Sequence, residues 1–382
     1  MNTRIVIACL TTASALCAAD PQSSEPKVLK HVSVYSVAGR YGGWPANHGI
    51  WSWDNEIVVG FSAAYYKWIG PDRHPYERDK PEEPFLARSL NGGDSWSIEP
   101  TPALVPPEGM YVAKGPGGKS SDLTEPIDFT KPGFTMTFRM TGGQEGKSWF
   151  FYSYDRGKTW KGPFNFPMLG QTSVMARTDY LVNGKHDALV FLTAAKSSGG
   201  EGRTFVAQTK DGGVKWNFVS WTSPDPGDGF SIMPSTVRLS KTDLVTTVRH
   251  EDSKRKGPNW IDAYASHDDG KTWQYLSRPA PDTGGHSGNP PSMIKLRDGR
   301  LAITYGHRSE PFEMRARLSS DGGKTWGKEI VLRGPAGAWD IGYPRTIQRA
   351  DGNIVTTYYW TTAPMKERTI EATIWDPGKA AK

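Results

Sequence analysis

The sequence predicts an all-β fold, and three observations point to it. The chain has 42 Gly and 29 Pro among 382 residues, which suits short strands joined by tight turns and argues against a helical bundle. A turn-like segment that ends in Trp recurs five times. Hydrophobic residues make up 37% of the chain and include 15 Trp, 15 Tyr and 14 Phe, enough apolar surface to form a core, so wholesale disorder is excluded.

Residues 1–19 have the features of an export signal. Arg4 supplies a positive charge, residues 5–16 are mostly apolar, and Cys17 and two alanines form a small-residue cleavage site before Asp20. We therefore expect one folded domain over residues 20–382 and a secreted or periplasmic protein. Both cysteines, Cys9 and Cys17, lie in the segment expected to be removed, so the mature chain would form no disulfide. No other stretch approaches the roughly 18 apolar residues of a membrane span.

The five repeats are predicted to be hairpin turns. They cover residues 89–96, 153–160, 209–216, 266–273 and 319–326, so consecutive copies start 53 to 64 residues apart. In each copy an Asp, or Asn91 in the first, can accept hydrogen bonds from backbone N–H groups two residues on. The following Gly tolerates positive φ, and the Trp packs on the returning strand. The aspartates of these segments are therefore structural and not candidate catalysts.

This pattern resembles the Asp-box, or BNR, repeat, which implies a β-propeller whose boxes join the outer two strands of four-stranded blades. A mean spacing of about 57 residues divides the mature chain into slightly more than six units, so we expect six blades rather than seven. Strand candidates at 345–349, 354–360 and 369–375 follow the last box without a sixth one. We expect the alternating segment 29–36 to complete the last blade, with all five boxes on the outer rim away from the channel mouth.

A six-bladed propeller with Asp-boxes resembles the sialidase (neuraminidase) superfamily. In that family three arginines bind the sugar carboxylate, a tyrosine is the nucleophile, a glutamate assists it and an aspartate is the general acid. Arg40 follows the first strand at the place of the first arginine, and Arg249 ends a strand as the second does. Arg308, Arg315 and Arg317 compete for the third place, where spacing favours Arg315 and keeps Arg308 in reserve. A guanidinium is always charged and donates two parallel hydrogen bonds to a carboxylate.

The resemblance also points to a nucleophile. Tyr343 lies just before a strand of the last blade, as the family tyrosine does, in the segment from Asp340 to Arg345. A neutral hydroxyl approaches an anionic anomeric centre without the repulsion that a carboxylate would meet. The ligand implied is an anionic sugar, such as a sialic or uronic acid.

The base and the acid are less well matched. Met233 occupies the place of the family glutamate, so the usual Tyr-Glu couple is missing. Glu251 shares a strand face with Arg249 and Asp340 lies three residues before Tyr343, which makes both candidate bases.

The family's general acid lies on a mobile loop before the first box, here the charged, Pro-rich segment 70–83. Asp79 has the best spacing for this role, with Asp72 and His74 as alternatives.

Charge and histidine spacing exclude other classes. The net charge of +6 is mild and scattered, which disfavours nucleic-acid binding. The eight histidines show no metal-ligand spacing, so we expect no metal site and no cofactor, and we expect a monomer.

The leading function is an exported exo-glycosidase that releases a terminal acidic sugar, most simply a sialic acid. The alternatives are a uronic-acid hydrolase or lyase that uses Tyr343 or a His as base, and a carbohydrate-binding propeller without catalysis.

Overall fold

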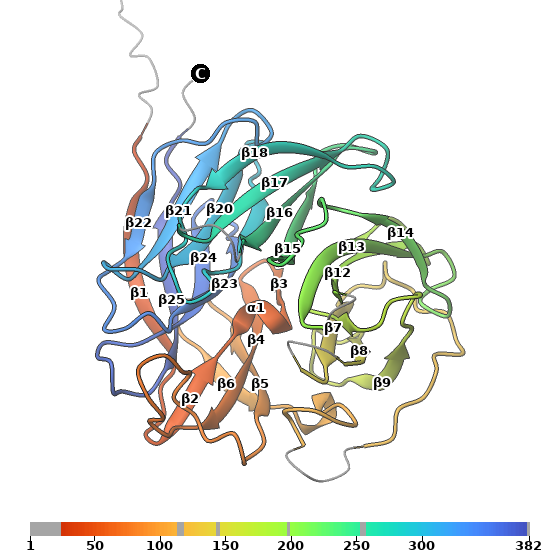
Figure 1. Cartoon of the computed structure of the whole chain (residues 1–382), viewed down its shortest axis with the longest axis horizontal. Coiled ribbons are helices and arrows are strands. Elements are labelled where there is room, and N and C mark those ends of the chain that lie inside the picture. The colour runs from red at the N-terminus through yellow and green to blue at the C-terminus, as the bar shows by residue number, and fades with distance from the viewer. Residues whose placement is uncertain (1–23, 113–117, 143–145, 197–198, 253–256, 380–382) are drawn as a thin grey trace, which may run out of the picture.

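The structure is a computed structural model that describes residues 24–112, 118–142, 146–196, 199–252 and 257–379. The expected signal segment 1–19 and its two cysteines lie outside these residues. Six antiparallel sheets stand around a common centre, as Figure 1 shows. The predicted six-bladed propeller is therefore confirmed.

Most blades have four strands in sequence order from the centre outward. The first strands of neighbouring blades contact one another, which identifies the inner end of each sheet. The strands are β2 (Arg40–Gly43), β4 (Glu56–Tyr65), β5 (Glu83–Ser89) and β6 (Ser97–Pro100) in blade 1; β7 (Thr135–Met140), β8 (Ser148–Ser153) and β9 (Lys161–Phe166) in blade 2; β10 (Val174–Met175), β12 (Ala188–Ala195), β13 (Glu201–Thr209) and β14 (Asn217–Trp221) in blade 3; β15 (Phe230–Arg238), β16 (Leu244–Glu251), β17 (Trp260–Ser266) and β18 (Gln274–Ala280) in blade 4; β19 (Ser292–Lys295), β20 (Leu301–His307), β21 (Glu313–Ser319) and β22 (Ile330–Arg333) in blade 5; and β23 (Gly342–Gln348), β24 (Ile354–Trp360), β25 (Thr369–Asp376) and β1 (Lys27–Tyr35) in blade 6.

Short elements complete this arrangement. The strand β3 (Ile50–Trp53) pairs with β4, and β11 (Tyr180–Val182) pairs with β12, so two blades have an interrupted inner strand. The single helical turn α1 (Pro45–His48) lies near the centre of the ring in Figure 1, and the 3₁₀ turn η1 (Pro102–Leu104) follows β6. No helix among the described residues is long and apolar enough to cross a bilayer.

The N-terminal strand closes the ring. β1 pairs antiparallel with β25, from Lys27 opposite Asp376 to Tyr35 opposite Ile370, as predicted for residues 29–36. Alternation on β1 buries Val32 and Val34 against the core of blade 6. The closure also explains the missing sixth box. A box links the third and fourth strands of a blade, and in blade 6 these are β25 and β1, which do not follow each other in sequence.

The boxes are turns held by side-chain hydrogen bonds, as the fourth copy shows. The Ser266 hydroxyl donates to Asp268 Oδ1 at 2.8 Å and accepts from the Gly270 N–H at 2.8 Å. Asp268 also accepts from the Thr272 N–H at 2.9 Å, and Trp273 Nε1 donates to the Gly270 carbonyl. Burial acts against the Asp268 charge, but the bonds from Thr272 and Ser266 lower the pKa of Asp268 to about 2.

The alternating strand directions place the boxes away from the loops that connect the blades. Turns between first and second strands and between third and fourth strands share one face of the ring. The three strands of blade 2 take the second to fourth places, so its box joins β8 and β9, and all five boxes lie on this face. Loops between second and third strands, and those that lead to the next blade, share the other face. We refer to this second face of the ring as the loop face.

Three inner-strand kinks prepare the loop face for a site. Trp44, Met233 and Tyr343 have φ of 57°, 54° and 50°, and each precedes a proline. Positive φ is unusual for bulky residues, and at Met233 and Tyr343 it coincides with a shift in strand register, as in a β-bulge. The kinks bring Met233 and Tyr343 into one cluster with Ala46 of α1.

Candidate active site

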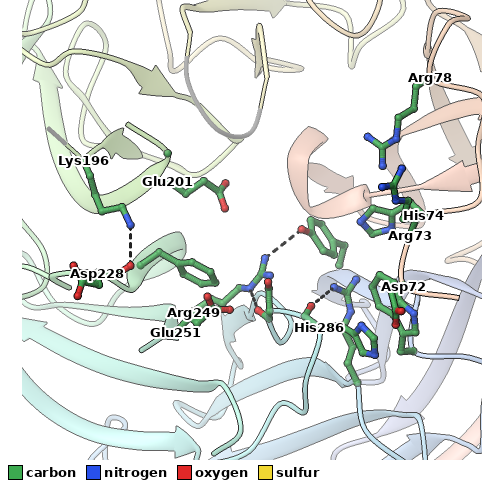
Figure 2. A pocket seen from close by; sticks show the side chains of 16 residues that line it. Asp72, Arg73, His74, Arg78, Lys196, Glu201, Asp228, Arg249, Glu251 and His286 are labelled. Carbon is green, nitrogen blue, oxygen red and sulfur yellow. Dashed lines mark hydrogen bonds between the residues drawn. The ribbon is translucent and has the colours of Figure 1, made fainter. Parts of the chain in front are cut away.

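A cavity of about 590 Å³ opens on the loop face, between blades 1, 3, 4, 5 and 6. Figure 2 shows its side chains, with Lys196 and Glu201 on one side, His74 and Arg78 on the other, and Arg249 between them. Of the residues predicted for the site, the cavity is lined by Arg249, Glu251, Arg308 and Tyr343, and of the alternatives by Asp72 and His74.

Arg249 is nearly fully buried, with 4% of its surface exposed, and lies near the end of β16. Its Nε donates to the Ser287 carbonyl at 2.7 Å, and its Nη1 donates to the Tyr343 hydroxyl at 3.2 Å. The guanidinium also contacts the sulfur of Met233 at 3.5 Å and the ring of Phe230. These partners fix the orientation of the guanidinium without neutralising its charge.

Arg308 directly follows β20 and is 2% exposed. Its Nε and Nη2 donate to the Ile341 carbonyl at 3.2 and 3.0 Å, and Nη2 also donates to the Tyr359 hydroxyl. Burial opposes its charge, but the nearby Tyr359, Tyr343 and Asp340 raise the pKa of Arg308 above its ordinary value. Among the described residues neither Arg249 nor Arg308 forms an ion pair within 4.0 Å, so the cavity contains two buried cations held by neutral acceptors.

Tyr343 is half-buried and lies next to both arginines. The Arg249 and Arg308 guanidinium carbons lie 5.9 and 5.3 Å from its ring centroid. Its backbone N–H donates to Asn289 Oδ1 at 3.0 Å, which anchors the kink. Within the described part of the chain, the hydroxyl has one hydrogen bond, the one from Arg249, and no carboxylate touches it.

Asp340 lies beneath the cavity wall in a dense network. Its Oδ1 accepts from His74 Nδ1 at 2.6 Å and from the Tyr359 hydroxyl at 2.6 Å. Its Oδ2 accepts from the Tyr41 hydroxyl at 3.1 Å and from Arg368 Nε at 3.2 Å. Although full burial disfavours a carboxylate, His74, Arg368 and Arg308 outweigh it and hold the pKa of Asp340 well below its usual range.

Aromatic rings line the cavity next to this network. Trp339 stacks on His286 with ring centroids 4.2 Å apart and lies 5.3 Å from the His74 ring. Trp44 meets His74 edge-on at 5.6 Å. Burial and the nearby Arg308 lower the pKa of His286. Flat rings beside charged groups are suited to hold the apolar face of a sugar ring.

Acidic groups line the opposite half of the cavity. Glu251 lies two residues after Arg249 on β16 and shares the cavity with it, as the strand alternation predicted. Glu201 forms an ion pair with Arg177, and Asp228 lies on the rim. No group of three or more His, Cys, Asp or Glu in the described segments is arranged to hold a metal ion.

The sequence-based preference for Arg315 as the third arginine of the site was wrong, because Arg315 lies outside the cavity whereas Arg308 lines it. Arg315 lies within β21, the third strand of blade 5, and its guanidinium pairs with Glu313 at 2.9 Å and Glu329 at 3.2 Å outside the cavity. The prediction depended on the spacing of the third arginine from Arg249 and from Tyr343, but the loop between β20 and β21 is shorter than that between β16 and β17. The counterpart of Arg249 at the end of a second strand is therefore Arg308. Arg317, the remaining competitor, also lies on β21 and faces Glu329 at 3.7 Å.

Arg40 and Asp79 also lie outside the cavity lining. Arg40 begins β2, but its Nη2 pairs with Glu83 at 2.8 Å and its guanidinium covers the Tyr65 ring at 4.4 Å. Asp79 is exposed in the loop between β4 and β5, whose earlier residues and Arg78 reach the cavity instead. Tyr76 in this loop forms an isolated antiparallel bridge with Tyr66, and Asp79 lies three residues beyond it.

Sequence reasoning missed the contact between His74 and Asp340, which are 266 residues apart in the chain. Each was considered separately, His74 as an alternative acid and Asp340 as a candidate base. Their pairing depends on the packing of a loop of blade 1 against the segment before β23, which no local pattern encodes. Trp339, directly before Asp340, was a usable signal, because ligand pockets are lined mainly by hydrophobic and aromatic side chains with a few polar or charged groups.

Comparisons with known proteins agree with this architecture. A BNR repeat-like domain matches residues 91–356, whereas the search of curated proteins found no match. A Dyadobacter fermentans protein of unknown function is similar, with 20% identity, a TM-score of 0.67 and coverage of 92% of this chain and 99% of that one.

Two solved glycoside-acting proteins share the fold as well. A Trypanosoma rangeli sialidase has 12% identity and a TM-score of 0.57, with coverage of 92% of this chain and 60% of that one. This chain thus spans less than two thirds of the sialidase's length. A Penicillium chrysogenum alpha-L-arabinanase, solved with arabinobiose, has 13% identity and a TM-score of 0.57, with coverage of 90% and 98%.

Proposed function

The chain belongs to the BNR repeat-like domain family, and from this and the cavity we propose that it is an exported glycoside hydrolase that releases a terminal acidic sugar from glycans, with sialic acid as the first candidate. The observation that carries the proposal is the pair of buried cations, Arg249 and Arg308, whose guanidinium carbons lie 5.9 and 5.3 Å from the Tyr343 ring centroid. Export is proposed from residues 1–19 and monomeric action from the sequence alone.

The two arginines support an anionic ligand. A buried guanidinium without an ion pair is costly to keep, and a carboxylate from a ligand would satisfy it with charge-assisted hydrogen bonds. Ser287, Tyr359 and backbone carbonyls already orient both groups, so little conformational freedom is lost on binding. A sugar carboxylate bound here would place its anomeric carbon beside the cavity wall formed by Tyr343.

In the proposed hydrolysis, the Tyr343 oxygen bonds to the anomeric carbon while the bond to the leaving oxygen breaks. The phenolic proton is lost to a base, and the leaving oxygen takes a proton. Water then attacks the anomeric carbon, and the bond from that carbon to the Tyr343 oxygen breaks. The base returns its proton to this oxygen, and the proton that water loses restores the acid. Arg249, which donates to the Tyr343 hydroxyl at 3.2 Å, is placed to stabilise negative charge that develops on this oxygen in the transition state.

A second function is favoured by Met233, which leaves Tyr343 without a carboxylate partner. A uronide lyase needs cations on the carboxylate and a base for the C5 proton, not a nucleophile. In that reaction the C5–H and C4–O bonds break, a C4=C5 double bond forms and the leaving oxygen takes a proton. Arg249, Arg308, Tyr343 and a histidine would be sufficient for it.

One experiment separates these functions. Purified protein is incubated with a panel of sialosides and of uronides, and released sugars and unsaturated products are measured by mass spectrometry. We expect free sialic acid or uronic acid without a double bond. Unsaturated product would select the lyase, and binding without turnover across the panel would select the carbohydrate-binding alternative. Tyr343→Phe, which keeps the ring packing, should lower turnover by orders of magnitude.

A further inference from the structure

We propose that His74, held by Asp340, is the general acid that protonates the leaving glycosidic oxygen. The inference rests on the proposed hydrolase function and deepens it, because it assigns the proton donor to a histidine of the loop between β4 and β5 instead of the aspartate that the family pattern suggests.

The carboxylate of Asp340 fixes the imidazole. Its four hydrogen bonds come from His74, Tyr359, Tyr41 and Arg368. An ionised carboxylate only accepts hydrogen bonds, so Nδ1 of His74 must be protonated and donate at 2.6 Å. This leaves Nε2 as the nitrogen that exchanges protons with a ligand, as in other oriented histidines.

The other nitrogen is available to the cavity. The His74 side chain is 27% exposed and lines the cavity, and the described part of the chain offers Nε2 no hydrogen-bond partner. Trp44 and Trp339 contact the ring at 5.6 and 5.3 Å and restrict its rotation. A group that is oriented by a buried carboxylate, clamped by aromatic rings and open on one edge is arranged for proton transfer.

The alternatives on the same face fit less well. Asp79 does not line the cavity, and Asp72 lies on the exposed rim. His286 stacks on Trp339 and, as far as the described residues show, has no carboxylate within hydrogen-bond distance to orient its ring. Among the described residues that line the cavity, His74 is the one histidine or carboxylic acid that combines exposure to the cavity with a hydrogen bond to a buried carboxylate.

The network also connects the acid to the carboxylate site. Tyr359 donates to Asp340 and accepts from Arg308. Asp340, which orients His74, and Arg308, which is proposed to bind the substrate carboxylate, therefore share Tyr359 as a partner.

In the step proposed, the bond from the anomeric carbon to the leaving oxygen breaks. The proton on Nε2 of the imidazolium passes to that oxygen, which leaves a neutral imidazole. The proton returns when water is deprotonated in the second step.

The test uses the leaving group. Wild type and His74→Gln are compared on two glycosides of the same acidic sugar, one with a 4-nitrophenyl leaving group that departs as an anion and one with an alkyl alcohol that must be protonated. We expect His74→Gln to lose about 10²- to 10⁴-fold in kcat/KM, which reports the first step, on the alkyl glycoside and less than about tenfold on the nitrophenyl glycoside. Asp340→Asn should show the same pattern with a smaller loss, because it disturbs only the orientation of the ring.

The chain offers a matched control. His267 lies in the fourth box, on the face away from the cavity, and its Nδ1 donates to Asp243 at 2.7 Å. His267→Gln should therefore leave the activity on both glycosides unchanged. His74→Gly with added imidazole should recover part of the alkyl-glycoside activity.

The outcomes distinguish a failure of the His74 assignment from a failure of the proposed hydrolase function. Equal losses on both glycosides, or no loss on either, with an active wild type would overturn the assignment of His74 alone. Circular dichroism of each variant shows whether the fold is kept. A wild type that hydrolyses no acidic glycoside would overturn the proposed function, and this inference with it.

Discussion

Arg249 and Arg308 differ from Arg315 and Arg40, the other two arginines predicted for the site, in the charge of their partners. Arg315 and Arg40 are each paired with glutamates, so their charge is already balanced. Arg249 and Arg308 are held by carbonyls, hydroxyls and a thioether. A guanidinium that is oriented but not neutralised is suited to a ligand carboxylate, whereas a neutralised one serves the fold.

This difference gives a first prediction. Arg249→Ala or Arg308→Ala should weaken binding of the acidic sugar by about 2 to 5 kcal/mol, since a charged contact in a buried site is lost. The expected result is a rise in KM of at least about thirtyfold. Arg315→Ala is the control and should leave KM within about twofold. Steady-state kinetics on the best substrate of the panel measure all three, and similar effects of all three would contradict the carboxylate site.

A buried glutamate beside the site titrates unusually. Glu82 is 2% exposed and its Oε2 has no hydrogen-bond partner. Burial, only partly offset by Ser62 and Arg78, raises the pKa of Glu82 to about 7. Since an unfolded glutamate titrates near pH 4.3, the folded protein keeps a proton that the unfolded chain loses, and the contribution of Glu82 to stability falls as the pH rises from about 4 to 7.

The second prediction isolates this contribution. Glu82→Gln should gain stability relative to wild type as the pH is raised from about 5 to 8, by an amount on the order of 3 kcal/mol. Urea unfolding of both proteins at several pH values measures the difference. Glu108→Gln, at an exposed glutamate, should show no such trend. A difference for Glu82→Gln that stays constant with pH would contradict a raised pKa.

At the scale of elements, the repeated turn and the strand order were predictable and the loops were not. The boxes locate the third and fourth strands of five blades, and the second strands precede them. The positions of Arg249 and Tyr343 relative to their strands follow from this order. Arg315 and Asp79 were misplaced because their assignment depended on loop length, and loops tolerate insertions and deletions without changing the blade.

The boxes give a third prediction. Asp268→Ala removes hydrogen bonds from Ser266 and Thr272 and should lower the free energy of unfolding by about 1 to 3 kcal/mol, with activity unchanged because the turn lies on the face away from the cavity. Asp351→Ala is the control. Asp351 lies in a turn of blade 6, where it accepts hydrogen bonds from Asn353 and pairs with Arg349. Its replacement should lower the free energy of unfolding by less than that of Asp268. Denaturant unfolding and activity assays measure both, and a loss of activity would contradict a purely structural box.

At the scale of the whole molecule, β1 closes the ring by pairing with β25, so we expect its burial to contribute to global stability. Val34 is 6% exposed in the core shared by blades 1 and 6, whereas Val37, just after the strand, is 48% exposed. Val34→Asp should lower the free energy of unfolding by about 3 kcal/mol or more, because an unpaired carboxylate would be buried. Val37→Asp should change it by less than about 0.5 kcal/mol. Thermal unfolding measures both, and equal effects would show that β1 does not hold the ring together.

The closure of the ring also determines when folding can be completed. His31 of β1 and Thr373 of β25 contact each other across 342 residues of sequence. During synthesis β1 leaves the ribosome before the strands of blade 6 with which it pairs, so its edge stays unpaired until β25 has also been released. Blades 1 to 5 can form from consecutive segments as they appear. The unpaired β1 is therefore the part of the nascent chain most exposed to wrong pairing. The rate of the last folding step should therefore depend on finding one distant partner rather than on building the blades.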